Sequence, residues 1–156
     1  ERTPNEWRLR FIDASHGRAQ EVADLTVAIT QDPAQVGVAG SGEEMERLQT
    51  HLAARWPDAG VILSHSTLVS DYWFLEVVPP EVSKGKALAF LGETYHIEAA
   101  EMIAVGDNFN DLDMIEFAGL GVAVENAPED IRAAADFIAP NNDEEGVACV
   151  IEKFLL

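Results

Sequence analysis

The sequence has little cysteine and little lysine. Cys149 is the only cysteine in 156 residues, which excludes an intrachain disulfide and predicts a reducing, cytoplasmic location. Lysine occurs only at positions 84, 86 and 153, and 10 basic against 28 acidic residues give a formal net charge of −18. Nucleic acids and anionic membrane surfaces bind basic faces, so neither is an expected partner. Salt-adapted proteins are also acidic and poor in lysine, and that alternative stays open.

Long apolar runs are missing as well. No stretch approaches the ~18–20 consecutive apolar residues of a membrane-spanning helix, and the N-terminus has neither an initiator Met nor a signal-peptide pattern. An apolar content of 47% is typical of a globular protein. The start of the sequence is expected to be an internal part of a longer chain.

The stretch from residue 102 to residue 111 combines a short apolar run with a polar turn. The apolar residues 102–105 predict a buried strand, Gly106 ends it, and two aspartates and two asparagines follow at once. Asp107 and Asp111 are hard oxygen donors of the kind that Mg²⁺ prefers. The pattern therefore predicts a Mg²⁺–phosphate site at the end of a parallel strand, where open α/β folds bind ligands. An Asx-rich turn with a helix cap explains the same residues, and both readings remain open on this stretch alone.

The chain divides into two parts at Pro79-Pro80. Residues 1–80 are expected to form a small α+β unit, and residues 81–156 alternate strands with helices, which predicts a parallel sheet covered by helices. Ser41 and Glu44 form a predicted capping box at the start of a helix over 42–55. The apolar spacing of the last helix, 144–155, predicts a face packed in the core. The other predicted strands are 7–12, 36–39, 61–63, 72–78, 102–105, 121–124 and 137–139, and the other predicted helices are 17–25, 84–95, 111–118 and 128–135.

Lys84 and Lys86 lie in the first turn of a predicted helix, where the helix dipole disfavours positive charge. A bound phosphate would resolve this conflict, because the helix N–H groups and Lys84 could hold the same anion. A solvated lysine pair at the helix start is the alternative.

Two segments resemble motifs of the haloacid dehalogenase-like phosphatases of the Cof type. Residues 76–88 (EVVPPEVSKGKAL) resemble the third motif of that family, and residues 106–114 (GDNFNDLDM) resemble the fourth. Residues 121–128, 135–138 and 142–147 also fit the family in the expected order. The resemblance implies a Rossmann-like core with a parallel sheet, present here in part (81–156), and the later portion of the cap domain that these enzymes insert into it (1–80).

The resemblance also implies roles for individual residues. Asp107 would bind Mg²⁺ directly, and Asp111 would support the metal or the neighbouring loop. Lys84 and Asn110 would hold the substrate phosphate. Asn142 would serve as a helix cap beside the site.

The nucleophile of the family does not occur in this sequence. The family uses an aspartate in an Asp-x-Asp-Gly-Thr motif, and the nearest match, around Asp13, lacks the second carboxylate. The spacing from Asp13 to Thr30 is too short for the strand–helix–strand unit that would have to lie between them. We therefore expect the nucleophile in a missing N-terminal segment, whose strand would lie beside strand 102–105, and that segment or another copy of the chain would be a partner. Strand 102–105 would otherwise be a sheet edge.

These observations predict the C-terminal part of a Mg²⁺-dependent phosphatase that acts on a small phosphorylated metabolite such as a sugar phosphate. The alternatives are a non-catalytic module that binds phosphate and Mg²⁺ and has lost the nucleophile, and a plain α/β regulatory domain with an acidic pocket.

Overall fold

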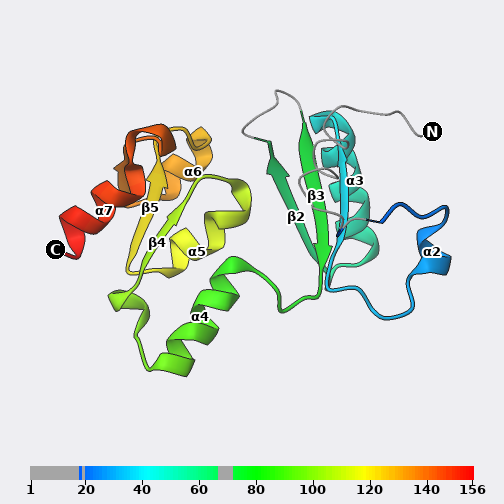
Figure 1. Ribbon diagram of the computed structural model, residues 1–156, viewed down its shortest axis with the longest axis horizontal. Helices are drawn as coiled ribbons and strands as arrows, with labels where there is room; N and C mark the ends of the chain where they lie inside the picture. Colours follow the sequence, from blue (N-terminus) through cyan, green and yellow to red (C-terminus); the bar gives the residue numbers. More distant parts are fainter. Residues whose placement is uncertain (1–17, 19, 67–71) are drawn as a thin grey trace. The chain divides into compact units, whose positions relative to one another are not determined.

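A computed structural model describes residue 18 and residues 20–66 and 72–156, and the chain divides into two compact units, residues 1–33 and 34–156 (Figure 1). In the first unit, helix α2 spans Leu25–Ala28, and the Asp24 carboxylate caps it by accepting a 2.8 Å hydrogen bond from Thr26 N. The predicted helix over 17–25 is wrong for the described residues, since α2 begins where that helix was to end. Leu25 and Val27 are 64% and 77% exposed, so no buried face stabilises a longer helix. The predicted strand 7–12 lies outside the described residues.

The second unit begins with a three-stranded antiparallel sheet and one helix. Its strands are β1 (Val36–Gly40), β2 (Gly60–His65) and β3 (Trp73–Val78), in the order β1-β3-β2. Helix α3 (Gly42–Arg55) packs on this sheet and begins with the predicted capping box, in which Ser41 and Glu44 bond each other's backbone N–H. Leu75 of β3 and Met45 of α3 are buried.

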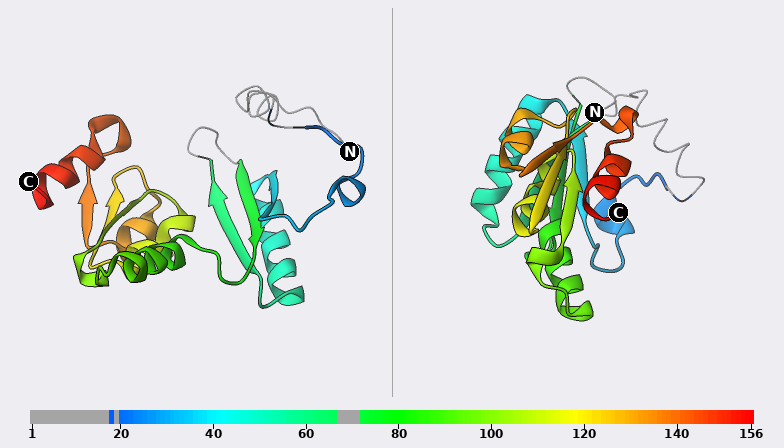
Figure 2. Two further views of the ribbon diagram at one scale, coloured as in Figure 1. Left: turned by 60° about the horizontal axis from the view of Figure 1, so that its bottom comes forward. Right: turned by 90° about the vertical axis from the view of Figure 1, so that its left-hand side faces the viewer.

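A parallel sheet follows in the same unit, with strands β4 (Ile103–Gly106), β5 (Leu120–Val124) and β6 (Phe137–Ala139) in that order. Helices α5 and α6 pack against the sheet, α4 packs on α5, and α7 lies beside β6 (Figure 2). Val122, Ile115 and Ile131 are fully buried at the centre of this layer. The helices are α4 (Lys84–Tyr95), α5 (Leu112–Phe117), α6 (Glu129–Ala134) and α7 (Gly146–Phe154), and the short 3₁₀ turns are η1 (Ala99–Glu101), η2 (Phe109–Asp111) and η3 (Asn142–Glu144).

The predicted fold class, a parallel α/β layer joined to a small α+β unit, is confirmed. Strand β4 pairs only with β5 among the described residues, so it is the sheet edge that the sequence predicted. The predicted domain boundary at residue 80 stays a prediction. Across the described part of the chain, no helix has the length and apolarity to cross a membrane.

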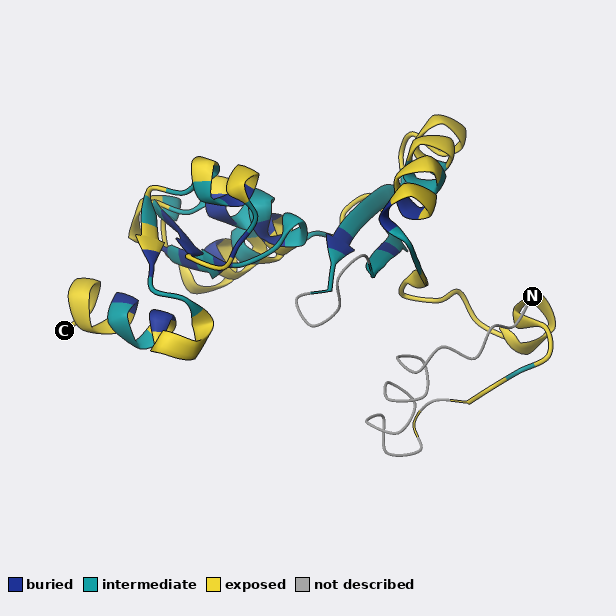
Figure 3. Cartoon of the chain, turned by 90° about the horizontal axis from the view of Figure 1, so that it is seen from above, coloured by how far each residue is buried: buried dark blue, intermediate teal, exposed yellow. Residues whose placement is uncertain are grey.

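Helix α7 differs from its prediction as a core helix. Val150 is buried, but Val147, Ile151 and Phe154 are 54%, 43% and 39% exposed. Figure 3 shows exposed positions along this C-terminal helix. The helix packs against β6, the last strand of a sheet of only three described strands, and this contact covers part of its apolar face. The amphipathic pattern was therefore right about the helix and wrong about how much of it is buried.

Candidate functional site

The predicted site lies where β4 ends. Gly106 closes the strand, and a Cβ atom at this position would collide with the side chain of Asp111. The absence of a side chain lets the loop fold back on the strand end. Asp111 is 2% exposed as a result, which is unusual for a carboxylate and requires that its oxygens be hydrogen-bonded.

Both oxygens of Asp111 have partners. Oδ2 accepts hydrogen bonds from the backbone N–H groups of Asp107 at 2.9 Å and of Asn108 at 3.1 Å. Oδ1 accepts from Nζ of Lys84, the first residue of α4, whose side chain is 49% exposed. Asp111 therefore holds the loop and the lysine together, and this contact resolves the unfavourable position of Lys84 at a helix start.

Asp107 is half-buried beside this pair. Burial raises the pKa of the Asp107 carboxyl, and Asp111 raises it further through charge repulsion and a hydrogen bond, while Lys84 and His65 oppose the shift. A bound cation would stabilise the ionised form of such a carboxyl group. Asp107 is thus the member of the acidic pair whose chemistry suits a metal ion.

The donors at this loop fit part of a Mg²⁺ site. Mg²⁺ commonly takes one or two carboxylates and fills its remaining positions with water and phosphate oxygens. Asp107 supplies one such carboxylate, whereas Asp111 is engaged by backbone N–H groups and Lys84. Among the residues described, no three His, Cys, Asp or Glu side chains are grouped so as to hold a metal ion. Within the described residues, the loop therefore provides one candidate carboxylate ligand, that of Asp107.

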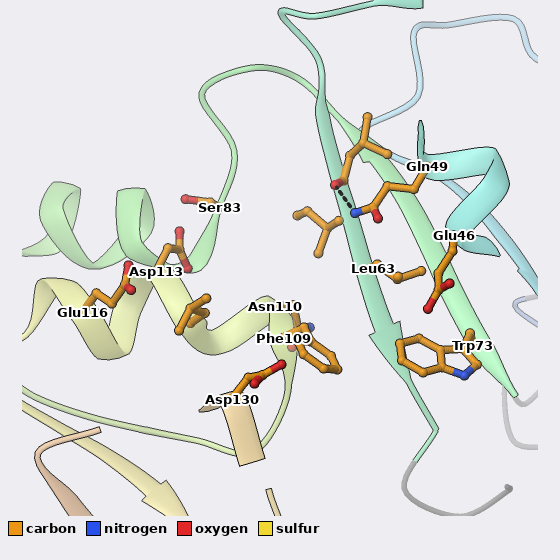
Figure 4. Close-up of a pocket in the computed structure, with 13 residues that line it drawn as sticks. Glu46, Gln49, Leu63, Trp73, Ser83, Phe109, Asn110, Asp113, Glu116 and Asp130 are labelled. Carbon is orange, nitrogen blue, oxygen red and sulfur yellow. Dashed lines mark hydrogen bonds between the residues drawn. The ribbon is translucent and has the colours of Figure 1, made fainter. Parts of the chain in front are cut away.

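Asn110 lines a cavity of about 680 Å³ (Figure 4). One wall comes from η2, α5 and the residue that caps α4, Ser83. The other wall comes from α3, β2 and β3, and includes Glu46, Gln49 and Trp73. The predicted residues Lys84, Asp107, Asn110 and Asp111 thus lie on one loop and the adjoining first turn of α4, with the cavity next to them.

Sequence reasoning missed the residues that tie this loop to the antiparallel sheet. The side-chain amide of Asn108 donates to the backbone carbonyl of His65 at 2.8 Å and accepts from the His65 N–H at 3.3 Å. Phe109 stacks on Trp73 with ring centroids 5.9 Å apart, and the His65 ring meets both rings edge-on. Asn108 and His65 are 43 positions apart, so no local pattern could reveal the contact.

Two further residues near the site make contacts that the sequence did not predict, and one of them, Asn142, is not the expected cap. Gly85 faces Asp113, whose carboxylate accepts the Gly85 N–H at 2.9 Å, so this glycine permits a close contact between α4 and α5. The 3₁₀ turn η3 is capped by Asn141 and not by Asn142. Asn142 instead donates its backbone N–H to Asn126 at 3.0 Å.

Fold and site together define an α/β protein with an acidic loop and a lysine at the carboxyl edge of a parallel sheet. The sequence profile of the haloacid dehalogenase-like hydrolases matches residues 5–151. The chain belongs to this family, and the predicted resemblance is confirmed.

Individual relatives agree with this assignment. A protein of Haemophilus influenzae is 36% identical over 133 residues, which is 85% of this chain and 48% of that protein. A phosphoglycolate phosphatase of Archaeoglobus fulgidus is 44% identical over 80 residues, or 51% of this chain and 36% of the enzyme. The crystal structure of a haloacid dehalogenase-like hydrolase from Bacteroides thetaiotaomicron superposes with a TM-score of 0.72 and 33% identity, over 98% of this chain and 56% of its own. This chain spans about half, or less, of the length of these relatives.

Proposed function

We propose that this chain is the Mg²⁺- and phosphate-binding half of a phosphatase that hydrolyses a small phosphorylated metabolite such as a sugar phosphate. The aspartate nucleophile would come from a segment with an Asp-x-Asp-Gly-Thr motif, which the 156 residues lack. Segment and chain would meet at the open edge of β4. The cytoplasmic location predicted from the cysteine content stays part of this proposal.

The observation that carries the proposal is the junction of Lys84, Asp107 and Asp111 at the end of β4. Lys84 would hold a phosphate oxygen, and its half-exposed side chain leaves the ammonium accessible to an anion. Asp111 would position Lys84 and the loop, and Asn110 would orient the phosphate from the cavity side. Asp107 would be the Mg²⁺ ligand, and the metal would neutralise charge on the phosphoryl oxygens.

A non-catalytic module that binds phosphate and Mg²⁺ is the second candidate. It is favoured by the missing nucleophile motif, and it predicts binding without turnover under every condition.

Turnover of p-nitrophenyl phosphate separates the two. We expect no hydrolysis by the purified chain alone, and Mg²⁺-dependent hydrolysis once a segment of about 80–100 residues that carries the nucleophile is added, by the usual size of such a unit. Failure of every such segment to restore activity would favour the non-catalytic module. Turnover by the chain alone that Asp13→Asn abolishes would refute the missing-nucleophile interpretation.

Metal binding is tested on the chain itself. Titration with Mg²⁺ should shift the amide resonances near Gly106 with weak affinity, and Asp107→Ala should abolish the response. The matched control is Glu93→Gln, an exposed carboxylate on α4 away from the loop. An unchanged response in Asp107→Ala would contradict the metal assignment.

A further inference from the structure

The side chain of Asn108 joins the loop after β4 to the end of β2. Its amide nitrogen donates to the His65 carbonyl at 2.8 Å, and its oxygen accepts from the His65 N–H at 3.3 Å. The same oxygen accepts from the Phe109 N–H at 2.9 Å, which fixes the orientation of the side chain. An asparagine side chain has about four hydrogen-bonding positions, so most of this one is committed to backbone groups.

The backbone of Asn108 belongs to a second set of hydrogen bonds, those of the proposed phosphate site. Its N–H donates to one oxygen of Asp111 at 3.1 Å, and the other oxygen of Asp111 accepts from Lys84. Asn108 therefore lies between the carboxylate that holds Lys84 and the last residue of β2. A shift of Asp111 should move the backbone of Asn108, and with it the side chain that holds His65.

The end of β2 is held to β3, so the two strands should respond together. His65 pairs with Trp73, and one residue further the Ser66 N–H donates to the Tyr72 carbonyl at 2.8 Å. The rings of His65 and Trp73 also contact the ring of Phe109 on the loop. These rings provide a second contact between the same two parts of the chain, and a test has to separate it from the hydrogen bonds of Asn108.

We propose that Asn108 is a positioning residue that couples the proposed Mg²⁺ and phosphate site to the end of the β2–β3 hairpin through the backbone of His65. A ligand that orders Lys84 and Asp111 then also tightens the contact with His65. Coupling between two sites is reciprocal, so loss of this contact weakens the ligand by about the same factor. The inference rests on the proposed function for the identity of the ligand, and it gives a role to a residue that does not line the cavity.

Amide hydrogen exchange tests the connection without a ligand. Asp111→Asn loosens the loop, and we expect the exchange rate of the His65 N–H relative to the Leu75 N–H to rise about three- to fivefold. Leu75 is fully buried on the central strand β3, so the ratio cancels a general loss of stability. The matched control is Asp136→Asn, which should leave the ratio unchanged, because Asp136 accepts the Gly121 N–H at 2.8 Å on another strand.

Two alanine variants decide which contact carries the coupling. His65→Ala removes the ring contacts but keeps both hydrogen bonds, since these use the backbone of residue 65. Asp111→Asn should therefore still raise the exchange ratio in His65→Ala and should have no effect on it in Asn108→Ala. The inference is overturned if the effect disappears equally in both variants, or if Asp111→Asn leaves the ratio unchanged in the otherwise unaltered chain.

Ligand binding supplies the second test. Mg²⁺ with inorganic phosphate should slow exchange of the His65 N–H in the full chain by about threefold, and Asn108→Ala should abolish this slowing and weaken phosphate by about the same factor. The amide resonances of Gly106 and Asn110 report that the ligands have bound. If these resonances shift while exchange at His65 is unchanged, the inference is overturned and the site stands. If neither resonance shifts, the proposed metal and phosphate site is wrong, and the inference falls with it.

Discussion

Replacing Asp111 should destabilise the fold more than replacing any other residue of the loop. Its side chain is almost fully buried and accepts three hydrogen bonds, two from backbone N–H groups and one from Lys84. A hydrogen bond to a charged group contributes about 1.5–3 kcal/mol when its partners are buried. Lys84 is 49% exposed and can be rehydrated, so the contribution of that pair is about 1 kcal/mol.

The two backbone N–H groups determine the rest of the cost. Asp107 and Asn108 are partly buried, so each unsatisfied N–H should cost about 1 kcal/mol, the lower end of the usual range. Asp111→Ala should therefore lower the free energy of unfolding by about 3 kcal/mol. Asp111→Asn keeps one acceptor oxygen of the same shape and should cost about 1–2 kcal/mol.

Urea denaturation of the two variants and of Asp107→Asn is the measurement. With a slope of about 1–3 kcal/mol per molar urea, a loss of 3 kcal/mol moves the midpoint by at least 1 M. Should Asp111→Ala fail to fold, Asp111→Asn still provides a number. The reasoning is refuted if Asp111→Ala costs less than about 1 kcal/mol, or if Asp107→Asn is as costly as Asp111→Asn.

Three further predictions concern the same loop. Burial and Asp111 raise the pKa of Asp107 above its ordinary value, so the folded chain disfavours the ionised form of this carboxyl. Without metal, the free energy of unfolding should therefore fall as the pH rises from the ordinary aspartate range through the raised pKa. Asp107→Asn should remove this trend in urea titrations at stepped pH. In the complete enzyme, Lys84→Ala should raise KM and lower kcat. Lys86→Ala should have a smaller effect on both, because Lys86 donates to the Pro80 carbonyl and pairs with Glu81. Equal effects of the two substitutions would contradict the assignment of Lys84 to the phosphate. Asn108→Ala should speed hydrogen exchange at the His65 N–H about tenfold, with Asn126→Ala as the control, and unchanged exchange would show that the Asn108 contact is not stable in solution.

Local signals explain why several elements could be predicted to the residue. Helices α3 and α4 begin directly after Ser41 and Ser83, whose side chains accept backbone N–H groups three residues ahead. Such caps depend on neighbours in sequence, so a pattern identifies them without knowledge of the fold. Strand β4 begins and ends one residue later than the predicted strand 102–105, because Gly106 still pairs with β5.

The start of α5 shows where local reasoning reaches its limit. The sequence predicts a helix from residue 111, but Asn108 caps a 3₁₀ turn over Phe109–Asp111 and the α-helix begins only at Leu112. The turn places Asp111 against Gly106 and Asn108 against His65. The contact between Asp111 and Gly106 joins residues five positions apart, so it lies within the range of local sequence patterns. The contact between Asn108 and His65 depends on how β2 approaches the loop.

The cavity could not be foreseen for the same reason. Its walls come from residues as far apart as Glu46 and Asp130, and no spacing rule connects them. Helix α7 shows a related limit. Its apolar spacing predicts that one face can pack, but it does not predict which surface covers that face.

The link between Asn108 and His65 uses the backbone of one residue and the side chain of the other. Substitutions at position 65 can therefore change the ring that meets Trp73 and Phe109 while both hydrogen bonds persist. Many side chains at position 65 should therefore preserve both hydrogen bonds to the loop. Position 108, in contrast, requires a side chain that can both donate and accept a hydrogen bond. A library randomised at residue 65 should retain the protection of the His65 amide in members of many kinds, and one randomised at residue 108 should retain it mainly in members that keep asparagine.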